Sequence, residues 1–239
     1  MEIQLLLVGC GIGDQMKKCV FTFDDGLETH LKLAAPCLKD NGFGATFFVT
    51  GARKLWHRME PAVREDELEW DRVADIHQMG FEIGNHTWSH NVAGRIRDVE
   101  KLEQFLMVEY NIITRSFCYP AYEHTDELVL GLKKGRYKHA RKGYSTSHAM
   151  ASQDRTVTDY YTQYETDPFL IYATGLFGKE ADYNFDQFRE DLANTPERAV
   201  PIFAFHGLRG LGREKYFDKC VRYLKDEGWQ IVAMEDLDD

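Results

Sequence analysis

The chain has 239 residues, a hydrophobic share of 44%, a charged share of 28% and a formal net charge of -10 at pH 7. This composition is typical of one globular domain and excludes disordered, collagen-like and coiled-coil chains. The negative charge argues against nucleic acid or an anionic membrane surface as a partner. No apolar run reaches the roughly 20 residues that a membrane-spanning helix needs.

The first residues predict an extension rather than part of the core. We expect residues 1–15 to be disordered or to precede the native start, and residues 16–239 to form the domain. The run MEIQLLLVGC ends at Cys10 in a form that resembles a lipoprotein cleavage site, but it lacks a basic segment, and its apolar core is shorter than the roughly 7 to 15 residues of a signal peptide. Five widely spaced cysteines without a CxxC pair favour free thiols in a reducing compartment. A cytoplasmic location is therefore expected, with a lipoprotein or exported form left open.

Short β-rich segments recur along the chain, and most of them precede a helical pattern. They are VFTF (20–23), ATFFVT (45–50), FEIG (81–84), SFCYP (116–120), YKHAR (137–141), FLIYAT (169–174), PIFAF (201–205) and WQIVAM (229–234). Strands that alternate with helices predict a parallel sheet with right-handed crossovers, and about seven or eight such units can close into a barrel. An open doubly wound sheet is the alternative fold.

Three helices are indicated by spacing and by end signals. Pro36 suits a first helical turn and Gly42 suits the end of that helix. Helical spacing of Val73, Ile76 and Met79 predicts a second helix before Gly80. A longer amphipathic helix is expected from the spacing of Val99, Leu102, Phe105 or Leu106, and Ile113.

Polar residues follow several of the predicted strands. They are Asp24 and Asp25 after VFTF, His86 after FEIGN, Pro120 and Tyr122 after SFC, and His206 after PIFAF. In a parallel barrel the catalytic residues gather at the carboxyl ends of the strands, so we expect these side chains to share one site.

The segment GNHTWSH carries two histidines, His86 and His90, four residues apart. On a helical turn this spacing would place both imidazoles on one face, where they can bind one ion. A carboxylate from VFTFDDG would complete two nitrogen ligands and one oxygen ligand, a set that leaves a position open for water. Zinc is the first choice for the cation, and cobalt, nickel or iron would accept the same ligands.

The adjacent Asp24 and Asp25 can divide two tasks. One carboxylate would bind the metal, and its neighbour would take a proton from a metal-bound water that attacks an amide or an ester. His206 could then protonate the leaving group. The competing interpretations are a helix cap with a turn for the two acids and a core histidine for His206.

TFDDG, HTWSH, a proline-bearing strand end and an apolar strand that ends in histidine occur here in the order found in the NodB-like polysaccharide deacetylases, carbohydrate esterase family 4. The chain resembles that family from about Lys17 to Leu237. The resemblance implies a distorted (β/α)7 barrel in a single domain, which removes N-acetyl groups, or sometimes O-acetyl groups, from amino sugars with a divalent metal. It implies one general base (Asp24), three metal ligands (Asp25, His86 and His90), one general acid (His206) and one backbone N–H for the oxyanion (Ala121).

Two family features are missing at their usual places. The third motif commonly begins with an arginine that positions the base, whereas FCYPAY has Cys118 there. No tryptophan lies between Gly143 and Pro201, where the family usually supplies one beside the catalytic histidine. Candidates for that aromatic role are Tyr160, Tyr161, Tyr164 and Phe169, and candidates for the acid that orients His206 are Asp154 and Asp167.

The predicted substrate contacts are Pro120, Tyr122, Trp88 and His124. Trp88 could either stack on a sugar ring or pack its own loop. The expected function is hydrolysis of the N-acetyl group of an acetylated amino sugar or glycoconjugate, with an intracellular substrate favoured. Two alternatives remain: an O-acetyl esterase or non-sugar amidase with the same site, and a carbohydrate-binding relative with weakened catalysis.

Overall fold

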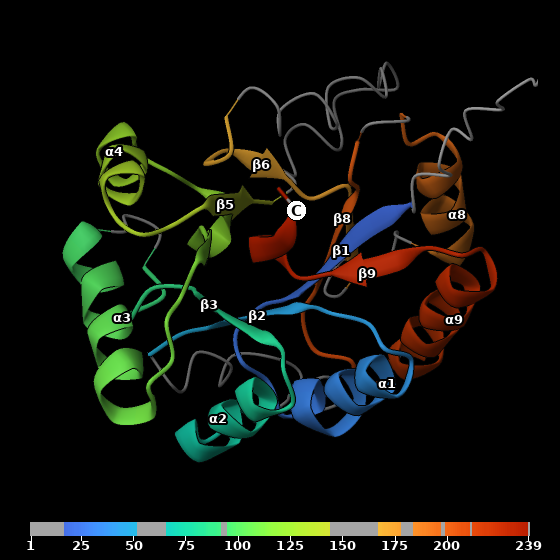
Figure 1. The fold of residues 1–239 in the computed structure, drawn as a ribbon, viewed down its shortest axis with the longest axis horizontal. Coiled ribbons are helices and arrows are strands. Elements are labelled where there is room, and N and C mark those ends of the chain that lie inside the picture. The colour runs from blue at the N-terminus through green and yellow to red at the C-terminus, as the bar shows by residue number, and fades with distance from the viewer. Residues whose placement is uncertain are drawn as a thin grey trace, which may run out of the picture.

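The computed structural model describes residues 17–51, 66–91, 95–143, 167–177, 184–196, 199–210 and 212–238. The predicted extension, residues 1–15, lies outside them. Within the described ranges, nine strands form one sheet in which every pairing is parallel, and helices cover the outside of that sheet (Figure 1). In the same ranges, no helix combines the length and apolar character that crossing a membrane requires.

The strands fall within or beside the segments that the sequence predicted. They are β1 (Lys18–Phe23), β2 (Thr46–Val49), β3 (Glu82–Asn85), β4 (Ser116–Cys118), β5 (His139–Lys142), β6 (Ile171–Tyr172), β7 (Gly175–Phe177), β8 (Ile202–Phe205) and β9 (Gln230–Val232). The helices are α1 (Ala35–Asp40), α2 (Trp70–Gln78), α3 (Ile96–Tyr110), α4 (Asp126–Lys134), α8 (Phe185–Ala193) and α9 (Arg213–Asp226), with a π-helix at His30–Ala34 and 3₁₀ turns at Pro120–Tyr122 and Met234–Asp236.

The sheet closes almost completely because β6 and β7 belong to one extended stretch. The strand order is β6-β5-β4-β3-β2-β1-β8-β7, so this stretch pairs with β5 at its start and with β8 at its end. The result is a distorted (β/α)7 barrel in a single domain, and the open doubly wound sheet is therefore wrong. Part of the distortion comes from β9, which pairs with the first half of β1 while β2 pairs with the second half.

The core explains why these segments became strands and helices. Phenylalanines from three adjacent strands stack inside it: the ring centroid of Phe23 lies 4.7 Å from that of Phe47 and 5.1 Å from that of Phe205. The helix predicted from residue 99 to 113 begins and ends three residues earlier than expected, as α3. Asn111 takes a left-handed conformation with φ 56° and ends α3, and Ile113 lies beyond it, 46% exposed.

The amino-terminal end of the barrel is closed by the carboxyl-terminal segment of the chain. Met234 donates its backbone N–H to Thr46 Oγ1 (2.7 Å), and Glu235 donates its own to Glu82 Oε2 (3.1 Å). The Thr46 hydroxyl donates to the same oxygen of Glu82 (2.5 Å). Burial raises the pKa of Glu82 to about 7 despite these hydrogen bonds, so its carboxyl group binds a proton more tightly in the folded protein.

This raised pKa predicts a pH-dependent stability. A carboxyl group whose folded pKa lies above its unfolded value stabilises the fold fully at low pH, and that contribution is lost as pH rises toward the folded pKa of about 7. Glu82→Gln is neutral at every pH. Its unfolding free energy relative to wild type should therefore increase with pH from 5 to 7, by up to about 1.4 kcal/mol per unit. Urea unfolding at four pH values tests this, with the exposed Glu123→Gln as control, and a pH-independent difference would contradict it.

Candidate active site

The carboxyl ends of three strands bring the predicted acids and two of the predicted histidines together. Asp24 and Asp25 leave β1, His86 leaves β3, and His206 leaves β8. Because neighbouring strand residues point to opposite faces, two adjacent acids can share a site only if the chain turns. Asp25 provides that turn, with a left-handed φ of 78°. As a result, His206 Nε2 lies 3.9 Å from Asp24 Oδ2 and 3.8 Å from Asp25 Oδ2.

Left-handed backbone recurs around this mouth of the barrel. In the described residues, the non-glycine positions with positive φ are Asp25, Thr87, His90, Ala121 and Tyr122, together with the helix cap Asn111. Such conformations are costly for residues with a Cβ, and they concentrate where function requires a side chain to be aimed.

Three of the predicted residues form a metal-binding geometry. His86 Nε2 lies 3.5 Å and His90 Nε2 3.2 Å from Asp25 Oδ1, and their ligand atoms all fall within 4.8 Å of one another. The expected helical turn is wrong, because the segment between the two histidines is a bend. Left-handed φ values at Thr87 (66°) and His90 (51°) bring the rings to 4.8 Å instead.

The hydrogen bond of His86 makes this set fit a cation. Nδ1 of His86 donates to the Cys118 carbonyl (2.7 Å), which leaves Nε2 as a bare lone pair facing the carboxylate of Asp25. Burial, followed by the charge of His90, lowers the pKa of His86 to about 4, so the ring is neutral at pH 7. Two acceptors face each other, and a divalent cation between them would satisfy both.

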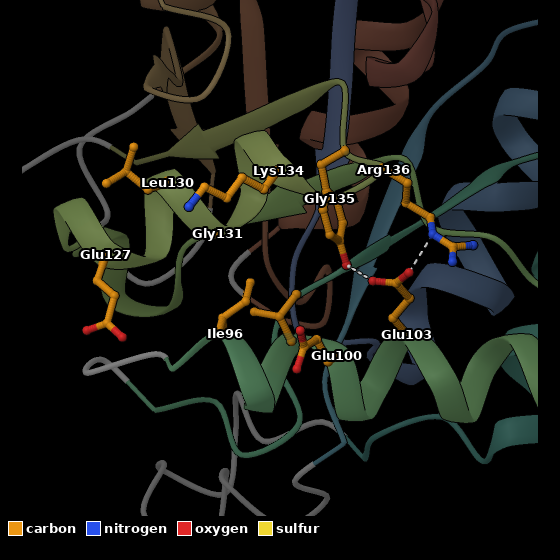
Figure 2. Close-up of a pocket in the computed structure, with 11 residues that line it drawn as sticks. Ile96, Glu100, Glu103, Glu127, Leu130, Gly131, Lys134, Gly135 and Arg136 are labelled. Carbon is orange, nitrogen blue, oxygen red and sulfur yellow. Dashed lines mark hydrogen bonds and ion pairs between the residues drawn. The ribbon is translucent and has the colours of Figure 1, made fainter.

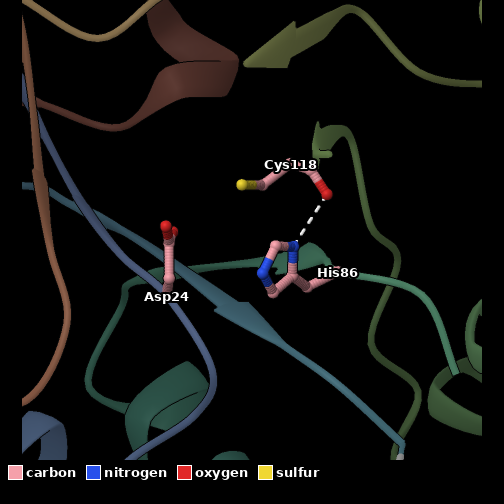
Figure 3. Close-up of side chains that lie close together, drawn as sticks. All are labelled: Asp24, His86 and Cys118. Carbon is pink, nitrogen blue, oxygen red and sulfur yellow. Dashed lines mark hydrogen bonds between the residues drawn. The ribbon is translucent and has the colours of Figure 1, made fainter. Parts of the chain in front are cut away.

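A second cluster consists of Asp24, His86 and Cys118 (Figure 3), whose ligand atoms also lie within 4.8 Å. The guanidinium of Arg141 already supplies the positive charge in this cluster. Its Nη2 lies 2.9 Å from Cys118 Sγ and donates to the Asp24 carboxylate. Burial also raises the pKa of the Cys118 thiol well above its ordinary value, so it stays protonated and is a poor metal ligand. The metal geometry therefore belongs to Asp25, His86 and His90.

Arg141 is the functional candidate that sequence reasoning missed. It is fully buried on β5, directly opposite Cys118 of β4, and its Nη2 donates to Asp24 Oδ1 (2.5 Å) and Oδ2 (2.6 Å). Burial alone would raise the pKa of Asp24, but Arg141 and then His206 outweigh it and hold the pKa below its usual range. The sequence held one indication of this role: Arg141 ends the predicted strand YKHAR, and the other site residues also lie at or just beyond the ends of predicted strands.

The third-motif turn, Pro120–Tyr122, follows β4. Within the turn, Tyr122 donates its backbone N–H to the Tyr119 carbonyl (3.0 Å), and Glu123 donates its own to the Pro120 carbonyl (3.2 Å). The backbone N–H of the exposed Ala121 is not used by these bonds. The Tyr122 ring lies edge-on to His206, with the centroids 6.5 Å apart.

Tyr122 is also fixed from the other side. The guanidinium of Arg141 lies 6.0 Å from its ring centroid, and a Cβ on Gly143 would come within 2.0 Å of the ring. Tyr122 therefore forms a packed wall between the arginine and His206.

Two other predicted substrate contacts lie in different surroundings. The Trp88 ring packs edge-on against Phe105 of α3 at 5.5 Å, and the Lys101 ammonium lies 4.2 Å from its centroid. His124 is exposed, and its ring centroid lies 5.7 Å from that of Tyr119. Packing thus accounts for much of Trp88, and sugar contacts by either residue stay predictions.

The candidates for the two missing features are mostly outside the described residues: Asp154, Tyr160, Tyr161 and Tyr164. The Asp167 carboxylate accepts from Lys133 Nζ (2.8 Å) and from the backbone of Phe169 (2.9 Å), and these bonds give no support to the prediction that it orients His206. Phe169 is buried in a separate cluster with residues of β4 and α4.

A pocket of about 720 Å³ lies elsewhere, between α3 and α4 (Figure 2). One of its acids, Glu103, forms an ion pair with Arg136 Nε (2.5 Å) and accepts from the Tyr137 hydroxyl (3.3 Å). The charges of Glu103 and Arg136 neutralise each other, and none of the predicted site residues lines the pocket.

The family model described as polysaccharide deacetylase matches residues 12–140, more than half of the chain. The chain belongs to the polysaccharide deacetylase family. The matched range includes the two acids, both metal-site histidines and the third-motif turn, whereas Arg141 and His206 lie beyond it. No curated protein is similar enough in sequence to count as a relative.

Solved structures of this family share the barrel at low sequence identity. The peptidoglycan deacetylase PdaC from Bacillus subtilis is 18% identical, with a TM-score of 0.57 over 94% of this chain and 91% of that one. A family 4 carbohydrate esterase from Streptomyces lividans, in complex with acetate, is 14% identical, with a TM-score of 0.55 over 90% and 91%. A CE4 family pseudoenzyme from Bacillus anthracis is 15% identical, with a TM-score of 0.61 over 94% and 66%. Enzymes and a pseudoenzyme thus share the fold, so the residues of the site must carry the functional argument.

Proposed function

We propose that this polysaccharide deacetylase hydrolyses the N-acetyl amide of an acetylated amino sugar or glycoconjugate. One divalent cation, with zinc as the first choice, would be held by Asp25, His86 and His90. The observation that carries the proposal is that the two neighbouring carboxylates have different partners. Asp25 faces the unprotonated Nε2 of His86, while Asp24 accepts hydrogen bonds from Arg141.

Each residue then has a distinct chemical task. When bound, the cation would supply a Lewis acid that polarises the acetyl carbonyl and lowers the pKa of water. Asp24, ionised and oriented by Arg141, accepts the proton of the attacking water. His206 donates a proton to the amine nitrogen as the C–N bond breaks. The free N–H of Ala121 donates to the carbonyl oxygen while negative charge develops on it.

The wall formed by Tyr122, together with the preceding Pro120, is the proposed contact of the acetyl group, because Tyr122 lies beside His206. Half-buried Trp88 and exposed His124 are proposed to contact parts of the substrate beyond the acetyl group. A glycan polymer is one class to test, since PdaC is a peptidoglycan deacetylase.

The carbohydrate-binding alternative loses part of its support. It was motivated by the missing third-motif arginine and the missing tryptophan, and Arg141 places a guanidinium on the proposed base from the neighbouring strand. A protein that only binds sugar has no need for a buried base held in this way.

Acetate release provides the test. Purified protein is stripped with chelator, reloaded with zinc, and incubated with N-acetylglucosamine monomers and oligomers, peptidoglycan fragments and O-acetylated xylan. We expect acetate from an N-acetylated substrate, loss of that activity on stripping and its return with zinc. Chelator-insensitive release, or none from any N-acetylated substrate, would refute the proposal, and release from xylan alone would favour the esterase alternative.

A further inference from the structure

His30 contacts both loops that build the site, although it is not one of the groups assigned above. It is fully buried and is the first residue of the π-helix that follows the Asp24–Asp25 loop. Its Nδ1 accepts from the backbone N–H of Leu27 (3.1 Å), and its Nε2 lies 3.1 Å from the carbonyl oxygen of His206. A peptide N–H can only donate and a carbonyl can only accept, so the ring must be the neutral tautomer with its proton on Nε2.

Both ring nitrogens of His30 are therefore used within the protein, and neither is available to a substrate. The ring is held in place by packing, with centroids 5.3 Å from Phe23 and 5.9 Å from Phe47. Burial lowers the pKa of His30 to about 4, which keeps this tautomer at neutral pH. π-helical turns are rare and are frequently found at functional sites.

The contact matters because His206 is the first residue beyond β8. The last backbone bond of that strand to the acidic loop is Asp24 N–H to Phe205 O (2.8 Å). Beyond it, His30 bonds the carbonyl of His206, and Thr29 Oγ1 accepts from the N–H of Leu208 (3.1 Å). Two consecutive residues thus hold the start of the loop that carries His206.

We infer that His30 is a positioning residue for the general acid: it holds the peptide carbonyl of His206 and thereby aims the imidazole at Asp24 and Asp25. This inference rests on the proposed function, because the acid role of His206 does. A misdirected acid should impair reactions in which the leaving group needs a proton and spare those in which it does not.

A matched pair of variants separates the two bonds of His30. In His30→Asn the side-chain oxygen can replace Nδ1, but nothing replaces the Nε2–H that bonds His206. In His30→Gln the side-chain nitrogen can replace Nε2 and keep that bond. Zinc-loaded variants are assayed on an N-acetylated oligosaccharide, whose amine must be protonated, and on 4-nitrophenyl acetate, whose phenolate leaves without a proton.

We expect His30→Asn to lower kcat on the amide by about 10-fold with little change in KM, and His30→Gln to stay within about 3-fold of wild type. Both should hydrolyse 4-nitrophenyl acetate like wild type and keep their zinc. Equal loss on amide and ester, or wild-type amide turnover in His30→Asn, would overturn the inference while leaving the proposed function standing. If wild type releases no acetate from any amide, the proposed function and this inference both fail. Should His30→Asn not fold, a loss of amide turnover in His30→Gln would be the overturning result.

Discussion

Replacing Arg141 with methionine should lower kcat for deacetylation by about 100-fold, since a misplaced catalytic group costs rates of that order. The guanidinium donates to both oxygens of Asp24 from a fully buried position, so its loss leaves a buried carboxylate without its main counter-charge. The pKa of Asp24 should rise, and the unfolding free energy should fall by about 3 kcal/mol, as for other broken buried pairs. Steady-state kinetics and urea unfolding of the zinc-loaded variant measure the two effects.

A swap across the strands separates the role of the charge from general damage. Cys118 and Arg141 are direct register partners on β4 and β5, so an arginine at either position starts from the same level of the barrel. The double variant Cys118→Arg, Arg141→Cys should recover at least about 10-fold in kcat over Arg141→Cys alone, if placing the base is what matters. Cys118→Ala, which removes a neutral thiol, is the control and should stay close to wild type. Full activity of Arg141→Met would show that Asp24 needs no guanidinium.

The barrel and the proposed metal site could be predicted because their signals are local. Asp24, His86 and His206 are each the first residue after a strand, and parallel strands bring such ends to one place. Asp25 and His90 are found close to these ends in the sequence. The third-motif turn was located for the same reason. Local patterns of this kind survive in a single sequence even where relatives of known structure are below 20% identical.

What could not be predicted depends on register and on backbone conformation. Arg141 lies far along the sequence from Cys118, and only the pairing of β4 with β5 shows that the two share one level. The bend between His86 and His90 depends on left-handed φ at Thr87 and His90, which neither residue type signals. The bonds of His30 could not be foreseen either, because one partner is a carbonyl 176 residues away.

The second large effect is expected when the two neighbouring acids, Asp24 and Asp25, are replaced separately, because they have different proposed roles. Asp24→Asn should lower kcat by about 10² to 10⁴-fold, the usual range for a lost general base, while the protein still binds one zinc per chain. The amide oxygen of asparagine can still accept from Arg141. The buried guanidinium nevertheless loses its counter-charge, so the unfolding free energy should fall by about 3 kcal/mol, as for Arg141→Met. Asp25→Asn should instead weaken zinc binding, because it removes the anionic partner of His86 and His90.

Zinc content after dialysis at fixed free zinc, measured beside kcat for both variants, distinguishes the two roles. His86→Ala serves as the reference for a lost ligand. Burial would raise the pKa of Asp25, but His90, then His206 and His86 outweigh it and hold the pKa below its usual range, which suits an anionic ligand. If Asp25→Asn keeps both zinc and turnover, Asp25 has neither role. If Asp24→Asn loses its zinc while Asp25→Asn keeps its zinc and loses turnover, the assignment is reversed. The left-handed turn at Asp25 would then aim the base at its water rather than the ligand at its metal.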